Sequence, residues 1–232
     1  MSVPTTAEAL STLVRLTLTR VTRGKLLWIS LAIAFLPIMF AGAMGQAKQS
    51  VDTITHATML IETFVLAILP SLYGAPAIAE EIEERTATYL WSRPIARWVI
   101  IAGKLLALAP FAGVVVLGSW VIAILVSLHQ LPSILSMVGL GFGAAGITIV
   151  ACGIATLFPK RGMALAIIYV LILDLPLGEV PASVRWLSVT HATTTLADLQ
   201  TDTSPAYGAL ALVVISAIWL AVAFRRVGRL ET

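Results

Sequence analysis

The sequence predicts an all-α integral membrane protein with six transmembrane helices. Its 232 residues are 59% hydrophobic and only 12% charged, whereas soluble domains average about 25% charged residues. Its mean hydropathy is +0.96, and the apolar residues are gathered in long runs. Too little polar surface remains to cover a water-soluble globule, and apolar runs of this length cross lipid as helices because the helix pairs its own backbone polar groups.

Six segments are suited to crossing the bilayer, which takes about 20 mostly apolar residues. They are residues 26–45, 58–79, 98–127, 134–158, 163–178 and 206–224. The third is long, so we expect its cytoplasmic end to project from the bilayer. The fifth is short, which favours a tilted or partly re-entrant helix. The length of the whole chain suits one transmembrane domain over residues 1–232.

The basic residues predict the orientation. With both termini in the cytoplasm, 13 of the 15 Lys and Arg residues face inward, leaving only Lys48 and Arg185 outside. The inward ones are Arg15, Arg20, Arg23, Lys25, Arg85, Arg93, Arg97, Lys104, Lys160, Arg161, Arg225, Arg226 and Arg229. Because cytoplasmic loops of membrane proteins are enriched in Lys and Arg, this asymmetry supports an even number of spans and cytoplasmic termini.

Residues 6–25 read as an amphipathic helix before the first span. Their apolar stripe consists of Leu10, Leu13, Val14, Leu18 and Val21, which fall on one helical face. Arginines lie among them, so we expect this helix to lie along the inner leaflet. The alternative is that these residues are the extended start of the first span.

Two further segments carry packing predictions. Gly139 and Gly143 in the fourth span form a small-xxx-small pair, which allows close helix approach within the chain or, alternatively, at a dimer seam. Residues 179–205 are the largest external segment, and we expect short helices or a re-entrant hairpin there, partly buried against the spans. Cys152 is the single cysteine, so no intramolecular disulfide forms, and it reads as a small buried residue.

A dense charged segment, residues 80–97, separates the second and third spans. Its ionisable residues are Glu80, Glu81, Glu83, Glu84, Arg85, Arg93 and Arg97. Seven charges at roughly 2.5–3.5 kcal/mol each would cost on the order of 20 kcal/mol at the bilayer centre, so the segment lies in the cytoplasm. Pro94 displaces the preceding residue from helical geometry, which predicts a helix, a corner and a second helix. This layout suits docking of a soluble partner; a solvated connector is the alternative.

The run EIEERTATYLWSRPIARWVIIAGKLLA, residues 81–107, resembles the signature of ABC transporter permeases of the type-2 (ABC-2 exporter) family. The matching positions are Glu81, Glu83, Thr86, Leu90, Ser92, Pro94, Ile95, Arg97, Gly103 and Lys104. Arg85 stands where the family usually has glycine before the threonine. The six spans, the N-terminal amphipathic helix and the external segment before the last span extend the resemblance along the chain.

The resemblance implies that the chain is half of a transmembrane dimer in a prokaryotic cell (inner) membrane and exports a substrate. Each half would receive a soluble ABC ATPase subunit through a coupling helix between the second and third spans. The expected coupling residues are Glu81, Glu83, Glu84, Arg85, Thr86, Ser92, Arg93, Pro94 and Arg97. The chain lacks a G-x-x-x-x-G-K-[ST] motif, so ATP and Mg²⁺ are expected on the ATPase, with no cofactor or catalytic residue on this chain. Its other partners would be a second permease copy or paralogue and membrane lipids, with no nucleic acid.

Other functions are weaker alternatives. A channel or secondary transporter would need ionisable groups along a pathway, for which Glu62 and Asp174 are the candidates; headgroup-level placement is the expectation for both. The E-E-x-x-x-R run of Glu80, Glu81 and Arg85 resembles the first motif of intramembrane CAAX-type proteases. The three histidines, His56, His129 and His191, match neither of that family's histidine motifs. No metal site is expected, and the sequence leaves open the substrate and the choice between homodimer and heterodimer.

Overall fold

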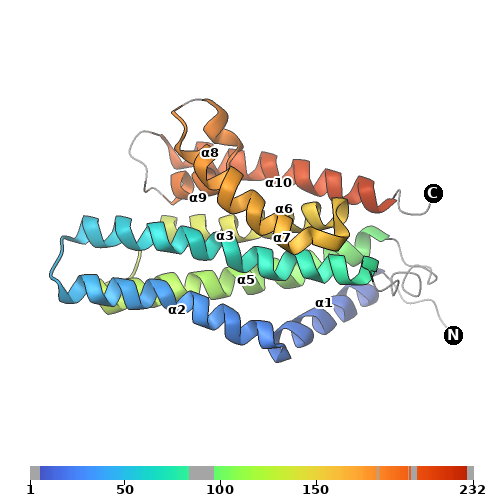
Figure 1. Cartoon of the computed structure of the whole chain (residues 1–232), viewed down its shortest axis with the longest axis horizontal. Coiled ribbons are helices and arrows are strands. Elements are labelled where there is room, and N and C mark those ends of the chain that lie inside the picture. The colour runs from blue at the N-terminus through green and yellow to red at the C-terminus, as the bar shows by residue number, and fades with distance from the viewer. Residues whose placement is uncertain (1–5, 84–96, 182, 198, 200–202, 229–232) are drawn as a thin grey trace.

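The computed structural model describes residues 6–83, 97–181, 183–197, 199 and 203–228, and every regular element in these ranges is a helix (Figure 1). The long helices are α1 (Thr6–Arg23), α2 (Lys25–Gln46), α3 (Val51–Glu83), α5 (Arg97–Leu128), α6 (Ile134–Leu157) and α10 (Pro205–Gly228). The shorter elements are η1 (Pro159–Arg161), α7 (Gly162–Ile168), η2 (Tyr169–Asp174), α8 (Leu175–Glu179), η3 (Ser183–Leu187) and α9 (Val189–Leu196).

Six helical segments are long and apolar enough to cross a membrane, as predicted. They are Lys25–Gln46, Val51–Ile78, Trp98–Leu128, Ile134–Leu157, Pro159–Glu179 and Pro205–Val227. The chain is therefore a multi-pass membrane protein. Helix α5 has 32 residues and is about 48 Å long at roughly 1.5 Å per residue. It exceeds the hydrocarbon thickness of about 30 Å, in agreement with the expectation that the third span is over-long.

The fifth span is helical throughout but irregular. It runs from η1 through α7 into η2, a π-helical stretch over Tyr169–Asp174, and then into α8. The helical run begins and ends beyond the predicted bounds, so it is longer than the sequence indicated. Wide π-helical turns often mark functional positions in helices, and this one ends at Asp174.

The core of the bundle lies around α3, α5 and α6, which Figure 1 shows running side by side. Leu66 and Leu69 of α3, Val116 of α5, and Ile147 of α6 are fully buried there. At Gly74 the backbones of α3 and α6 approach so closely that a Cβ would lie 2.9 Å from the Thr148 carbonyl oxygen. Cys152 is buried and unbridged beside this contact, and its Sγ lies 3.2 Å from the Gly74 carbonyl oxygen.

Gly139 and Gly143 of α6 pack within the chain. This agrees with the first of the two alternatives from the sequence, which were packing within the chain and a dimer seam. A Cβ at Gly139 would lie 2.7 Å from the Ala197 nitrogen, and one at Gly143 would lie 2.4 Å from Thr193 Oγ1. Both contacts involve the α9 segment, which lies in the predicted external region. That region contains short helices partly buried against the spans, as expected, and α9 also packs on α10 at Gly208.

Helix α1 is separated from α2 rather than continuous with it. Gly24 between them has an extended backbone, with φ −79° and ψ 156°, and the chain changes direction there (Figure 1). Part of the predicted apolar stripe packs on α5, where Leu10 and Leu13 face Gly103. The position of α1 along the inner leaflet stays a prediction.

Candidate functional site

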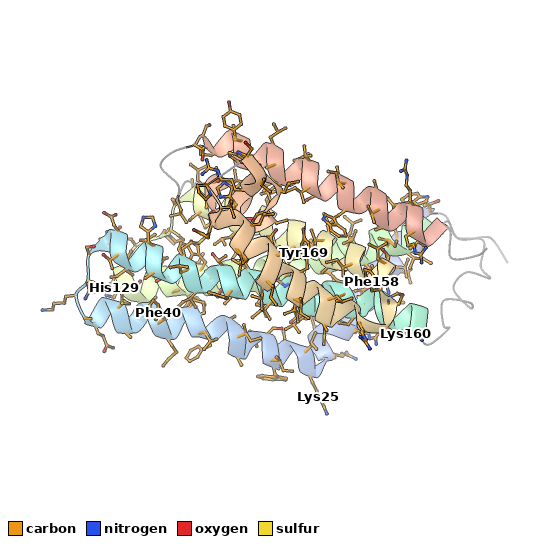
Figure 2. All side chains as sticks on the ribbon, turned by 45° about the horizontal axis from the view of Figure 1, so that its top comes forward. Lys25, Phe40, His129, Phe158, Lys160 and Tyr169 are labelled. Atoms are coloured by element: carbon orange, nitrogen blue, oxygen red, sulfur yellow. The ribbon has the colours of Figure 1, made fainter. Side chains whose placement is uncertain are left out.

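The candidate site is the end of the bundle where the charged segment joins α3 to α5. Figure 1 shows that the Glu83 end of α3, the Arg97 end of α5, helix α1 and the Gly228 end of α10 gather at this end. In Figure 2, Lys160 lies at this end and His129 lies at the other. The described ends of the chain and several basic residues therefore share one end with the flanks of the charged segment.

The predicted coupling residues fall at the edge of the described structure. Glu81 and Glu83 belong to the last turn of α3, and Arg97 is the first residue of α5. The others, Glu84, Arg85, Thr86, Ser92, Arg93 and Pro94, lie outside the described residues. The helix–corner–helix arrangement of residues 80–97 therefore stays a prediction, while its two flanking helices are established.

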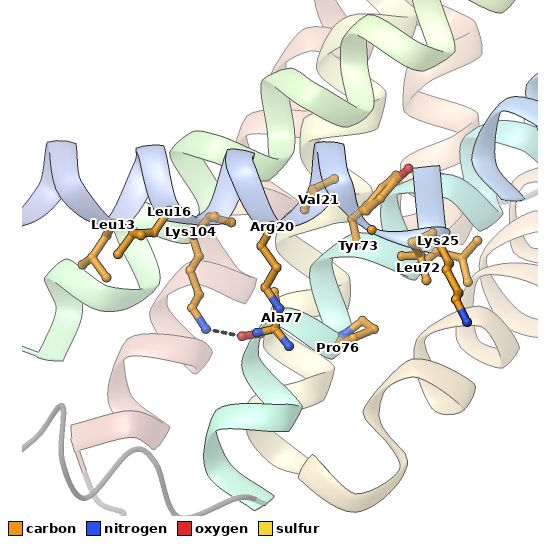
Figure 3. A pocket seen from close by; sticks show the side chains of 13 residues that line it. Leu13, Leu16, Arg20, Val21, Lys25, Leu72, Tyr73, Pro76, Ala77 and Lys104 are labelled. Atoms are coloured by element: carbon orange, nitrogen blue, oxygen red, sulfur yellow. Dashed lines mark hydrogen bonds between the residues drawn. The ribbon is translucent and has the colours of Figure 1, made fainter. Parts of the chain in front are cut away.

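Lys104 joins these two helices. It lies on α5, is only 4% exposed, and its Nζ donates a hydrogen bond to the Ala77 carbonyl oxygen on α3 (Figure 3). A buried ammonium is costly unless it is hydrogen-bonded, so this contact fixes the start of α5 against the end of α3. Lys104 is one of the positions that match the family signature, but the sequence assigned it no role. The feature that could have indicated one is its single charge inside an apolar run.

Gly103, the neighbour of Lys104, holds α5 against α1. A Cβ at this position would lie 3.0 Å from Leu13 Cβ and 3.4 Å from Leu13 Cδ1. Glycine permits this close approach, since a larger side chain would press against Leu13. The Gly103–Lys104 pair thus links α1, α3 and α5 within one turn of helix.

Tyr73 adds a polar contact to α2 and an aromatic contact to α5. Its hydroxyl donates to Ser30 Oγ on α2, and its ring meets that of Phe111 edge-on at 5.1 Å. Both Tyr73 and Ser30 are buried. The four helices α1, α2, α3 and α5 are therefore connected at the end of the bundle that bears the charged segment.

These helices also enclose a groove of about 440 Å³ that is lined mainly by apolar side chains. Its lining includes three cationic residues, Arg20, Lys25 and Lys104. Figure 3 shows Arg20 and Lys104 extending from different helices toward the turn of α3 at Pro76 and Ala77. We call this feature the basic groove.

Glu62 is buried within the helix bundle, and its expected placement at headgroup level stays a prediction. It is 0% exposed, and Oε1 accepts a hydrogen bond of 2.7 Å from Ser119 Oγ on α5. Glu62 Oε2 and Thr58 Oγ1, one helical turn away on α3, are buried and have no hydrogen-bond partner among the described residues. An ionisable residue inside a membrane bundle is a candidate for a functional pathway, and for Glu62 that role stays a prediction.

Asp174 is also buried, at 1% exposure, and receives a set of hydrogen bonds from the start of α9. Oδ1 accepts from the Val189 amide at 2.7 Å, and Oδ2 accepts from the Thr190 amide at 2.9 Å. Oδ2 also accepts from the hydroxyls of Ser188 at 3.2 Å and Thr190 at 2.7 Å. These contacts indicate that Asp174 positions α9 against the fifth span; a role for it in a pathway stays a prediction.

The described residues were also compared with what a metal-dependent intramembrane protease requires. No group of three or more His, Cys, Asp or Glu side chains that could hold a metal gathers among the described residues. His56 lies 25 residues before Glu81 on the same helix, which is about 38 Å at roughly 1.5 Å per residue. This separation does not suit the glutamate–histidine convergence of a protease.

His191 lies in α9, away from the charged segment. It is 3% exposed, and its ring packs edge-on against Trp186 at 5.1 Å. Burial lowers the pKa of the His191 imidazole, and the positive charge of Arg185 lowers it further, while Glu179 and Asp174 raise it. His191 is therefore a packed side chain of α9 and not an exposed loop histidine.

Among the comparisons with known proteins, the match comes from a family model. A search of curated proteins finds no match. The model of the family described as ABC-2 membrane transporter related matches residues 14–167, more than half of the 232 residues. The match includes most of α1, the spans α2, α3, α5 and α6, and the charged segment between α3 and α5. The chain belongs to the ABC-2 membrane transporter related family.

Proposed function

We propose that this chain is the permease subunit of an ATP-driven exporter complex. A separate ABC ATPase subunit hydrolyses ATP with Mg²⁺, and the permease converts that hydrolysis into export of a substrate. Two permease chains, identical or paralogous, form the transmembrane pathway in a prokaryotic cell membrane with their termini in the cytoplasm. The observation that carries the proposal is the family match over residues 14–167, which includes the whole charged segment.

The coupling residues of this proposal are Glu81, Glu83, Glu84, Arg85, Thr86, Ser92, Arg93, Pro94 and Arg97. Their charges and the corner that the sequence predicts at Pro94 suit docking on a soluble protein, since arginine is enriched among the residues that dominate interface energies. The distribution of Lys and Arg along the sequence supports placing them in the cytoplasm.

The contacts beside this segment support a mechanical role for it. A displacement of the segment reaches the Glu83 end of α3 and the Arg97 end of α5 together, since the segment joins them. Lys104 ties α5 to α3 at Ala77, and Gly103 seats α1 on α5. Movement of the ATPase would therefore shift several helices as one group instead of bending a single loop.

Of the two pathway candidates, Glu62 is better supported than Asp174. It has a buried carboxyl oxygen to which no described residue donates a hydrogen bond, whereas the oxygens of Asp174 accept hydrogen bonds from the start of α9. An alternating-access pathway along the contact of α3 with α5 would pass Glu62 and Ser119.

The test is charge reversal at Glu83 and Glu84 in the tagged chain, purified from its own host in mild detergent. E83K/E84K is expected to reduce both the recovered ATPase subunit and the ATP hydrolysis per permease, while the variant still melts cooperatively. D52K/E179K is the matched control, because Asp52 and Glu179 are exposed and belong to the other end of the bundle. Unchanged ATPase recovery and hydrolysis in E83K/E84K would refute the coupling assignment.

A further inference from the structure

The basic groove has the composition of a lipid-binding site. Lipid binding there would be separate from the proposed transport function. Its apolar wall comes from α1, α2 and α3 and includes Leu13, Leu16, Val21, Leu26 and Leu72. Its cations come from three different helices: Arg20 of α1, Lys25 of α2 and Lys104 of α5. A ligand that fits must combine a negative charge with a hydrocarbon chain.

We propose that the basic groove binds one anionic phospholipid of the surrounding membrane. The phosphate contacts Arg20 and Lys25, and an acyl chain follows the leucine-lined wall toward the bilayer interior. Charge complementarity indicates an anionic headgroup, since three helices contribute cationic side chains to the described lining. Basic pockets between transmembrane helices bind anionic headgroups in the same way.

The geometry favours a lipid over a soluble anion. The groove lies between α1 and the bundle and is lined predominantly by carbon, so water-soluble phosphate would leave most of its wall unfilled. Leu16 is 62% exposed, and neighbouring residues of α2 are also exposed, with Trp28 at 74% and Ile29 at 51%. In a membrane protein these apolar surfaces face hydrocarbon, so a lipid can enter the groove from the side.

The bound lipid would hold α1 in place beside Gly103 and Lys104. Arg20 and Lys25 lie on either side of the Gly24 break between α1 and α2. A phosphate shared by them bridges that break. The lipid thereby fixes the angle between α1 and the first span at the end that carries the charged segment.

The test is lipid retention by the purified full chain, measured by native mass spectrometry against phosphatidylglycerol and phosphatidylcholine of matched acyl chains. The wild type is expected to bind one phosphatidylglycerol in preference to phosphatidylcholine. R20Q/K25Q is expected to weaken phosphatidylglycerol binding about 30-fold, because each cation near a membrane surface contributes about 1 kcal/mol and 1.4 kcal/mol is a tenfold change.

The matched control is R15Q/R23Q, which also removes two positive charges, both from α1. Arg15 and Arg23 are exposed and do not line the basic groove, so this variant is expected to retain the wild-type preference. A second variant, T17W, keeps all charges but fills the groove beside Thr17, and it is expected to lower retention of the lipid.

Three outcomes would overturn the proposal. Equal losses in R20Q/K25Q and R15Q/R23Q would mean that the lipid responds only to surface charge. Full retention in R20Q/K25Q would exclude the groove as the site. Displacement of the lipid by millimolar inorganic phosphate, with T17W unchanged, would mean that a free anion occupies the site. These results are independent of the ATPase, so they are distinguishable from failure of the proposed transport function.

Discussion

Replacing Gly103 by leucine is expected to force α1 away from α5. A Cβ at position 103 would already lie 3.0 Å from Leu13 Cβ, and leucine adds three further carbon atoms beyond that Cβ. Overpacking of this kind costs about 1–3 kcal/mol. For a chain of this length, each kcal/mol corresponds to a change in Tm of about 2–4 °C, so G103L is expected to melt about 2–12 °C below the wild type.

A matched control and a compensating variant isolate the contact. Gly118 lies on the same helix, and a Cβ there would have no atom within 4 Å. G118L is expected to keep or raise Tm, because leucine favours a helix over glycine by up to about 1 kcal/mol. L13A removes most of the side chain that G103L meets. The decrease in Tm of G103L/L13A is therefore expected to be smaller than the sum of the decreases in the two single variants.

The assay is thermal unfolding in one detergent at fixed lipid content, followed by tryptophan fluorescence and analysed as a double-mutant cycle. A positive interaction of at least about 1 kcal/mol between Gly103 and Leu13 is expected. If G103L and G118L melt alike, or if G103L and L13A are additive, the packing of α1 on α5 at Gly103 is wrong.

Three further predictions concern the buried polar groups. D174A removes the acceptor for the Val189 and Thr190 amides, and each buried donor left unpaired costs about 1–3 kcal/mol, so its Tm is expected to fall by at least about 4 °C; a Tm equal to that of the wild type would contradict the described contacts. E62Q keeps an oxygen that accepts from Ser119 but cannot ionise, so its Tm is expected to stay within a few degrees while transport by the reconstituted complex falls; unchanged transport would remove Glu62 from the pathway. Burial lowers the pKa of His191 below its usual value, so the unfolded chain binds a proton more readily and stability is expected to fall as pH decreases below about 6.5; Tm measured from pH 8 to pH 5 should decline less in H191Q, and equal slopes would contradict this assignment.

The spans were predictable because a single physical requirement fixes them. About 20 consecutive apolar residues satisfy the hydrocarbon core whatever their partners are, and all six predicted runs coincide with helices. Their ends were less predictable. The second span was expected over residues 58–79, but α3 extends from Val51 to Glu83, because helical hydrogen bonding continues into polar sequence where hydropathy gives no signal.

The packing partners depend on residues far apart in the sequence. The glycines of α6 predicted a close contact, yet nothing local identified α9 as the partner, about 50 residues later. The same limit applies to Lys104, whose charge was visible but whose bond to the Ala77 carbonyl requires α3 and α5 to be docked. Asp174 was visible as an ionisable residue in an apolar run, but its role at α9 follows only from the fold.

The most direct test of the permease proposal is to purify the tagged chain from its own membrane in mild detergent and identify co-purifying proteins by mass. We expect a stoichiometric soluble subunit that carries a Walker A sequence and hydrolyses ATP, recovered with two permease chains. Isolation of the chain as a stable oligomer with no ATPase subunit, under conditions that preserve its lipids, would contradict the central claim that ATP hydrolysis by a partner drives this protein.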